Sequence, residues 1–280
     1  MKNTGVEQDG VTGVLKENFD RIEAQIAQAC REAGRPRGEV ALMAVSKMHP
    51  ASAIVAAEAL GVRLFGENRV QEFQEKSAQL VLLRGKLHGE PGQAGQAHGK
   101  LHGLLHGEPG QAGQAGQAGA EFHLIGHLQS NKAARAAELF ASVDTLDSVS
   151  LAERLNQAAT RLGRRMAVLI EIKLSHEESK AGLVPESAEL PLLLERLGDL
   201  PGLQLRGLMT VPPFLEDLTA VRPYFARLRS LRDQLAAAHP RLSFEELSMG
   251  MSHDFPVAIA EGATQVRIGT ALFGPRSYPK

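Results

Sequence analysis

Cysteine is almost absent from this 280-residue chain, and so is any excess of charge of one sign. The one cysteine, Cys30, has no partner for an internal disulfide, which is typical of a protein from a reducing compartment. Lys and Arg number 31 against 32 Asp and Glu, a net charge of −1, so no global field attracts nucleic acid or an anionic membrane surface. A small molecule is therefore the expected partner.

Long hydrophobic runs are also missing. No stretch approaches the roughly 18 apolar residues that a membrane span needs. The first ten residues, MKNTGVEQDG, lack the apolar segment of a secretory signal. We therefore expect a cytoplasmic protein without a membrane partner and, because no hydrophobic interface stripe is visible, a monomer.

Short apolar runs alternate with amphipathic helical stretches along most of the chain. An extra amphipathic helix is expected first, over residues 11–33. The eight apolar runs that we expect to be strands are 40–46, 63–66, 122–126, 142–146, 166–173, 204–211, 244–250 and 265–269. Several lack strict alternation, which is typical of parallel strands buried on both faces. The helical stretches are 51–60, 69–83, 132–140, 149–162, 185–197, 219–238 and 256–261.

This alternation predicts the α/β class and a single (β/α)8 TIM barrel domain over residues 1–280. A doubly wound open sheet is the alternative. It is disfavoured because no Gly-rich dinucleotide fingerprint follows the first strand.

Residues 84–120 interrupt the pattern with a low-complexity insert, in which LHGEPGQAGQA at 87–97 recurs at 105–115. We interpret it as a loop between a helix and the third strand, on the barrel face away from the usual active site. It carries four histidines, but the neighbouring Gly, Gln and Ala supply no carboxylate or thiolate that would favour a metal tract; these are His88, His98, His102 and His106. Its removal is expected to leave function intact.

Polar residues at the carboxyl ends of the strands should surround one pocket, because those ends meet on the active-site face of a barrel. Lys47 follows the first strand, where a lysine either extends to water or, when partly desolvated, attacks an aldehyde. The turns after the last two strands carry Gly250 with Ser252 and Gly269 with Thr270, whose N–H and hydroxyl groups can hold a phosphate. The other strand-end residues that we expect to line the site are Asn68, Met209, Ser248 and Met251.

A strand-end lysine and two phosphate turns indicate a phosphorylated carbonyl ligand, either a sugar phosphate or pyridoxal 5′-phosphate (PLP). Arg267, two residues before the last turn, favours PLP. A guanidinium facing a pyridine nitrogen donates to it without losing its own proton. It thereby weakens the cofactor as an electron sink.

Seven motifs in order carry a resemblance to a known family: AVSKMHP, FGENRVQE, FHLIGHLQSNK, HEESKAGL, RGLMTV, LSMGMSHDF and VRIGTALFGPR. They resemble the pyridoxal phosphate homeostasis proteins over about residues 11–276, the insert excepted. The resemblance implies a fold-type III barrel, like the N-terminal domain of alanine racemase. By position it makes Lys47 the Schiff-base lysine, Asn68 a residue lining the cofactor and Arg267 the partner of the pyridine nitrogen. The phosphate cradle it implies consists of Met251, Ser252, Gly269 and Thr270.

Two features depart from that family. The repeat insert has no counterpart in it, and Lys173 stands where members usually carry a neutral residue such as Asn. The family implies a PLP carrier or buffer whose recipients are PLP-dependent apoenzymes, without established turnover.

The alternative is a PLP-dependent racemase or decarboxylase, and we disfavour it. A racemase needs two acid–base groups, and Lys47 supplies at most one. In alanine racemases a tyrosine from a further domain supplies the other, whereas this chain ends about ten residues past the last expected strand, and its tyrosines, Tyr224 and Tyr278, are poorly placed. An aldolase working without PLP would not call for Arg267. We therefore expect no catalytic residue and no metal, with Lys132 and Lys180 as secondary aldehyde acceptors.

Overall fold

The eight expected strands are present and close into a barrel in which every neighbouring pair is parallel, in the order β1 to β8. The computed structural model describes residues 5–87, 101–106, 119–175, 177 and 181–275. The strands are β1 (Ala41–Val45), β2 (Leu64–Glu67), β3 (Glu121–Leu124), β4 (Ser142–Leu146), β5 (Met166–Glu171), β6 (Leu203–Met209), β7 (Glu246–Met251) and β8 (Gln265–Ile268). The predicted α/β barrel is confirmed.

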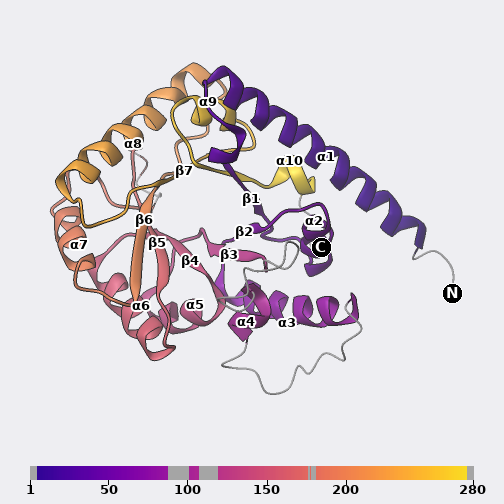
Figure 1. Ribbon diagram of the computed structural model, residues 1–280, viewed down its shortest axis with the longest axis horizontal. Helices are drawn as coiled ribbons and strands as arrows, with labels where there is room; N and C mark the ends of the chain where they lie inside the picture. The colour runs from indigo at the N-terminus through magenta and orange to yellow at the C-terminus, as the bar shows by residue number, and fades with distance from the viewer. Residues whose placement is uncertain (1–4, 88–100, 107–118, 176, 178–180, 276–280) are drawn as a thin grey trace.

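Helices surround the strands (Figure 1). They are α1 (Gly5–Glu32), α2 (Ala51–Ala59), α3 (Val70–Leu87), α4 (Leu101–His106), α5 (Ala133–Leu139), α6 (Val149–Arg161), α7 (Glu189–Leu197), α8 (Leu218–Ala238), α9 (Phe255–Ala260) and α10 (Thr270–Phe273), with short 3-10 turns η1 (Arg37–Glu39) and η2 (Ser130–Lys132). The main hydrophobic core lies between this helical layer and the outward faces of the strands, where Ala44, Phe65 and Leu124 are buried.

The barrel interior combines small, apolar and charged side chains. Gly66 leaves room there for two neighbours, because a Cβ at this position would lie 2.8 Å from side-chain atoms of both Met43 and Ile125. The first and last strands close the barrel with Met43 opposite Arg267. The register therefore brings the arginine of the last strand next to the strand that leads to Lys47.

The extra N-terminal helix α1 packs along α9 and α10, beside the seam between β8 and β1 (Figure 1). Asn18 Nδ2 donates to the Leu272 carbonyl at 3.0 Å, and Arg35 Nη1 donates to the carbonyls of Ile259 and Ala263 at 2.9 and 2.8 Å. These side-chain bonds fasten α1 and the segment that follows it to α10, to α9 and to the connection between α9 and β8.

Part of the insert is helical, and this differs from the expected loop. Residues 101–106 form α4, in which Leu105 is fully buried and its carbonyl accepts a hydrogen bond from Arg84 at 3.0 Å. His106 Nε2 lies 3.0 Å from the Leu139 carbonyl. The repeat thus supplies one apolar side chain that packs against the barrel. His88 and His98 lie outside the described residues.

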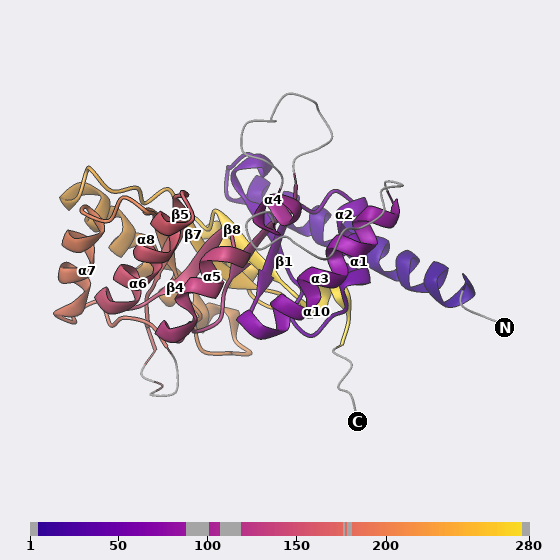
Figure 2. The same ribbon diagram turned by 90° about the horizontal axis from the view of Figure 1, so that it is seen from below.

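The insert helix and the last helix lie on opposite sides of the barrel, α4 at the top and α10 at the bottom of Figure 2. Since α10 follows the carboxyl end of β8, α4 lies on the expected face away from the mouth. Burial lowers the pKa of His102 to about 3 and that of His106 to about 4, so both rings are neutral near pH 7. Within the part of the chain that the structure describes, no group of three or more His, Cys, Asp or Glu is arranged to hold a metal ion.

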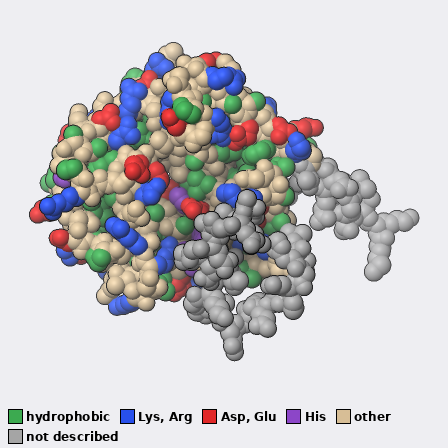
Figure 3. Space-filling view, viewed as in Figure 1, with side chains coloured by type: hydrophobic (Ala, Val, Ile, Leu, Met, Phe, Trp, Pro, Cys, Tyr) green, Lys and Arg blue, Asp and Glu red, His purple; other side chains and the backbone are tan. Residues whose placement is uncertain are grey.

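Charges of both signs are interspersed over the face shown in Figure 3, as the near-zero net charge predicts. The helices among the described residues include none that combines the length and apolarity required to span a membrane.

Candidate functional site

Lys47 lies in the turn directly after β1 and is half-buried. The turn has an unusual backbone, since Met48 has a φ of 61°, a conformation that non-glycine residues adopt rarely. The Met48 amide donates to Glu72 Oε1 at 2.6 Å, and the Ser46 hydroxyl donates to Glu67 Oε1 at 2.8 Å. Bonds from α3 and β2 thus hold the residues on both sides of the lysine.

A buried ion pair supports this turn from outside the barrel. Lys76 of α3 donates to Glu67 Oε1 at 2.7 Å and to the Ser46 carbonyl at 2.9 Å. Burial raises the pKa of Glu67, while the charge and hydrogen bonds of Lys76 oppose that rise. The pair was not predicted, because Lys76 follows Glu72 at the i, i+4 spacing of an ordinary surface pair on a helix.

The two glycine turns lie side by side at the ends of β7 and β8. Gly250 is the next-to-last residue of β7, so it lies in the strand and not, as expected, in the turn that carries Ser252. It has a φ of 91°, and a Cβ there would lie 2.6 Å from the Ala258 Cβ, so this end of the strand requires glycine. The Ala271 amide points at Ser252 Oγ over 3.5 Å, which joins the second turn to the first. The neighbouring Met251 amide donates to Asp254 Oδ1 at 2.6 Å. The Met251 N–H therefore stabilises its own turn.

Arg267 lies almost fully buried inside the barrel, 4% exposed. Its Nη1 donates to Ser248 Oγ at 2.8 Å and its Nη2 to the Thr210 carbonyl at 2.7 Å. A guanidinium carries five N–H donors, so these contacts leave further donors for a ligand. Burial lowers the pKa of Arg267, and the negative charges of Asp144, Asp254 and Glu171 oppose this.

A column of polar side chains continues from Arg267 into the barrel. Gln265 Nε2 donates to Ser248 Oγ at 2.8 Å and reaches Asp144 Oδ2 at 3.4 Å. The same Asp144 oxygen lies 3.0 Å from His123 Nδ1. Burial disfavours the charged imidazole, but the charge of Asp144 and the hydrogen bonds prevail and raise the pKa of His123 to about 10. A buried His–Asp ion pair thus forms the base of the column that positions Arg267.

Two further residues that we expected to line the site, Asn68 and Met209, lie at the carboxyl ends of strands. Asn68 directly follows β2, and its backbone lies against Gly126, where a Cβ would be only 2.3 Å from the Asn68 carbonyl oxygen. Met209 ends β6 and is fully buried.

The remaining candidates are spread over the chain. Lys132 ends η2, beyond β3, and Tyr224 of α8 packs against the core in the outer layer, so it does not line the mouth. Lys180 and Tyr278 lie outside the described residues.

Barrel closure brings the main candidates together. Since β8 pairs with both β7 and β1, the two glycine turns and the Lys47 turn follow three adjacent strands. The rings of His49 and Phe273 lie 4.9 Å apart, so the turn after β1 also contacts α10. A lysine amine, two hydroxyl-bearing glycine turns and a buried guanidinium therefore share one end of the barrel.

This fold and this site define a class of barrel. The family model for the N-terminal domain of alanine racemase matches residues 18–277. An alanine racemase of Clostridium difficile 630 has the same fold, with a TM-score of 0.62 over 96% of this chain and 58% of that chain, at 16% identity. The chain is thus an alanine racemase N-terminal-type barrel.

Closer relatives specify the family. A pyridoxal phosphate homeostasis protein of Aquifex aeolicus is 37% identical over 262 residues, 94% of this chain and 98% of the relative. The structure of PipY from Synechococcus elongatus, with PLP bound, has a TM-score of 0.71 and 37% identity, covering 93% of this chain and all of that one. The protein belongs to the pyridoxal phosphate homeostasis protein family, as its motifs predict.

Proposed function

We propose that this protein binds PLP through Lys47 as a Schiff base and serves as a cytoplasmic carrier or buffer of the cofactor. The observation that carries the proposal is the convergence of Lys47, Arg267 and the two glycine turns on adjacent strands of one barrel end. The relationship to PipY, whose structure holds PLP, supports the same ligand.

The residues present fit the chemistry of PLP. The hydroxyls of Ser252 and Thr270 suit a phosphate, because each can donate a hydrogen bond to a phosphate oxygen and the two turns that carry them lie side by side. The buried guanidinium of Arg267 suits the pyridine nitrogen, and Asn68 and Met209 would line the ring. When bound, PLP supplies an aldehyde that condenses reversibly with primary amines.

A carrier fits these residues better than a racemase. Arg267 is held by two hydrogen bonds of 2.7 and 2.8 Å and stays protonated, so it damps the electron sink that carbanion chemistry needs. The tyrosine that the structure describes, Tyr224, lies in the outer layer. We further propose a monomer that delivers PLP to apoenzymes. The buried, free Cys30 is in keeping with a reducing compartment.

The decisive experiment follows the colour and the covalent attachment. PLP-loaded protein should be yellow, and borohydride should bleach it and fix the cofactor on the Lys47 peptide in mass spectrometry. Lys47→Ala should lose both signals, whereas Lys16→Ala on exposed α1 should keep them. Thr270→Val should raise the Kd for PLP roughly tenfold, since one charge-assisted hydrogen bond is lost.

A colourless wild type that takes up no PLP would contradict the proposal. If Lys47→Ala still carried PLP after borohydride reduction, another lysine would form the Schiff base, and Lys132 would be the first to test. Racemisation or decarboxylation of an amino acid by the loaded wild type, at a rate useful to a cell, would replace the carrier with an enzyme.

A further inference from the structure

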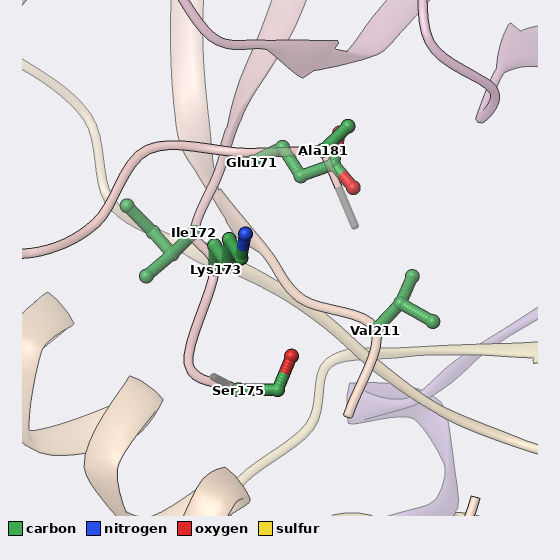
Figure 4. A pocket seen from close by; sticks show the side chains of 6 residues that line it. All are labelled: Glu171, Ile172, Lys173, Ser175, Ala181 and Val211. Carbon is green, nitrogen blue, oxygen red and sulfur yellow. The ribbon is translucent and has the colours of Figure 1, made fainter. Parts of the chain in front are cut away.

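A cavity of about 160 Å³ opens at the carboxyl ends of β5 and β6, across the barrel mouth from the strands that carry Lys47 and the glycine turns. Figure 4 shows the side chains that line it. Its lining comprises Glu171, Ile172, Lys173, Ser175, Ala181 and Val211. One water occupies about 30 Å³ of liquid volume, so the cavity has room for roughly five waters or one small organic molecule.

Two polar atoms of this lining are buried without a partner. Glu171 Oε2 and Ser175 Oγ have no hydrogen-bond partner. Both residues are buried, since only 7% of Glu171 and 9% of Ser175 is exposed. Buried polar groups in native proteins nearly always find a protein, water or ligand partner. The pair of orphan atoms at one cavity therefore indicates a polar occupant.

The walls of the cavity are built by backbone on both sides. The Leu183 amide donates to the Glu171 carbonyl at 2.8 Å, and the Lys173 amide donates to the Leu183 carbonyl at 2.9 Å. Gly182, with a φ of 108°, lies so close that a Cβ there would be 3.0 Å from the Glu171 Cγ. The segment that contains Gly182 and Leu183 thus holds Glu171 in place whether or not a ligand is bound.

The cavity lining offers a hydrogen-bond acceptor at one side and a hydrogen-bond donor with a nearby positive charge at the other. Glu171 offers an unused carboxyl oxygen, which accepts hydrogen bonds when ionised. Ser175 offers a hydroxyl donor, and the Lys173 amino group adds positive charge; both polar ends point into the space in Figure 4. Ala181 and Val211 supply apolar surface between them, whereas the Ile172 side chain points away from the space into the hydrophobic core.

We propose that this cavity binds a small α-amino acid, with its ammonium group on Glu171 and its carboxylate on Ser175, near Lys173. This assignment rests on the proposed function in one respect: the amino acid's primary amine would lie at the same barrel mouth as the PLP aldehyde that we propose for Lys47. Glu171 would bind the ammonium group and Ser175 the carboxylate of that ligand, and the two contacts together would hold it at the mouth in a fixed orientation.

The charge state of Glu171 sets the expected pH dependence. Burial raises the pKa of Glu171 to about 7, the Asp147 carboxylate of the β4 end adds to the rise, and Arg267 of β8 opposes it. The other charged or titratable groups around it are Lys173, two residues past the end of β5, and His127, whose Nδ1 lies 3.2 Å from Asp147 Oδ2. An ammonium ligand requires the ionised carboxylate, so affinity should rise with pH from about 6 to 8.

Calorimetric titration of the full chain with glycine and L-alanine, with and without PLP, tests the proposal. Methylamine and acetate serve as single-charge probes and should bind more weakly than either amino acid. Glu171→Gln should weaken binding of glycine roughly tenfold to a hundredfold and remove its pH dependence, because a charge-assisted bond is lost. Glu245→Gln, at an exposed carboxylate, should leave both unchanged.

Three results would overturn the assignment: no binding of either amino acid by the wild type, equal binding by Glu171→Gln, or tighter binding of acetate than of glycine. The absorption of bound PLP measures PLP uptake independently of amino-acid binding. A wild type that binds glycine but takes up no PLP contradicts the proposed function alone, and one that takes up PLP but binds no amino acid contradicts this inference alone. Retained PLP uptake in Glu171→Gln would show that the variant is folded.

Discussion

Lys76 and Glu67 form an ion pair that is shielded from solvent behind the β1 turn, with Nζ 2.7 Å from Oε1 and side-chain exposures of 7% and 0%. The pair connects α3 to the end of β2, and the same ammonium also reaches the Ser46 carbonyl beside Lys47. It is therefore part of the framework that positions the candidate Schiff-base lysine.

Removing the lysine of this pair should destabilise the fold. Lys76→Met leaves a buried, unpaired carboxylate, so the free energy of unfolding should fall by about 3–5 kcal/mol in urea denaturation. Lys16→Met breaks an exposed pair with Asp20 and should cost less than about 1 kcal/mol. Equal losses in the two variants would contradict the buried-pair interpretation, and adding Glu67→Gln to Lys76→Met should recover part of the loss.

The His123–Asp144 pair should make stability depend on pH above neutrality. Because the folded pKa of His123 is raised from 6.5 to about 10, its contribution is fully present below pH 6.5 and is lost as pH rises through 10. Asp144→Asn should lower the His123 pKa, measured by NMR titration, and cost roughly 3–5 kcal/mol at pH 7. The exposed Asp199→Asn serves as the control. An unchanged His123 titration in Asp144→Asn would refute the pairing.

Gly250, at the end of β7, and Gly61 form a matched pair of glycines for testing the strand end that leads into the Ser252 turn. Both have a φ near 90°, 91° and 97°, but a Cβ at Gly61 meets no atom within 4 Å. Gly61→Ala should therefore cost only the backbone strain of about 1–2 kcal/mol. Gly250→Ala adds the collision with Ala258 and should cost more and also weaken PLP retention. Equal unfolding free energies, with PLP retention unchanged, would show that this strand end tolerates a side chain.

The helix within the repeat insert should contribute to stability and not to ligand binding. Leu105→Ala removes a fully buried side chain and should cost about 2–5 kcal/mol. Leu82→Ala, at a residue 40% exposed in α3, should cost clearly less. The Kd for PLP should be unchanged in both variants, because α4 lies on the face opposite the mouth. A Leu105→Ala variant as stable as the wild type would mean that α4 is dispensable.

The order of strands and helices was predictable because parallel strands buried on both faces produce continuous apolar runs, and eight such runs separated by amphipathic helices have few closed arrangements. The insert shows where this reasoning stops. Its composition predicts a loop, yet Leu105 forms part of a helix because the neighbouring barrel surface offers a buried position that no local pattern reveals.

The candidate site likewise has features that the sequence predicted and features that only the structure shows. The sequence by itself determined that Lys47 and the two glycine turns lie at strand ends and that Arg267 lies on the last strand, since strands and their ends are marked by local pattern. It also determined the family through its motifs. Only the tertiary structure decided their neighbours. The Lys76–Glu67 and His123–Asp144 pairs join residues from different strands and helices, and burial at the end of β5 leaves Glu171 Oε2 without a hydrogen-bond partner. Burial and pairing of charges are set by elements distant in sequence, and the chain order of residues does not encode those distances.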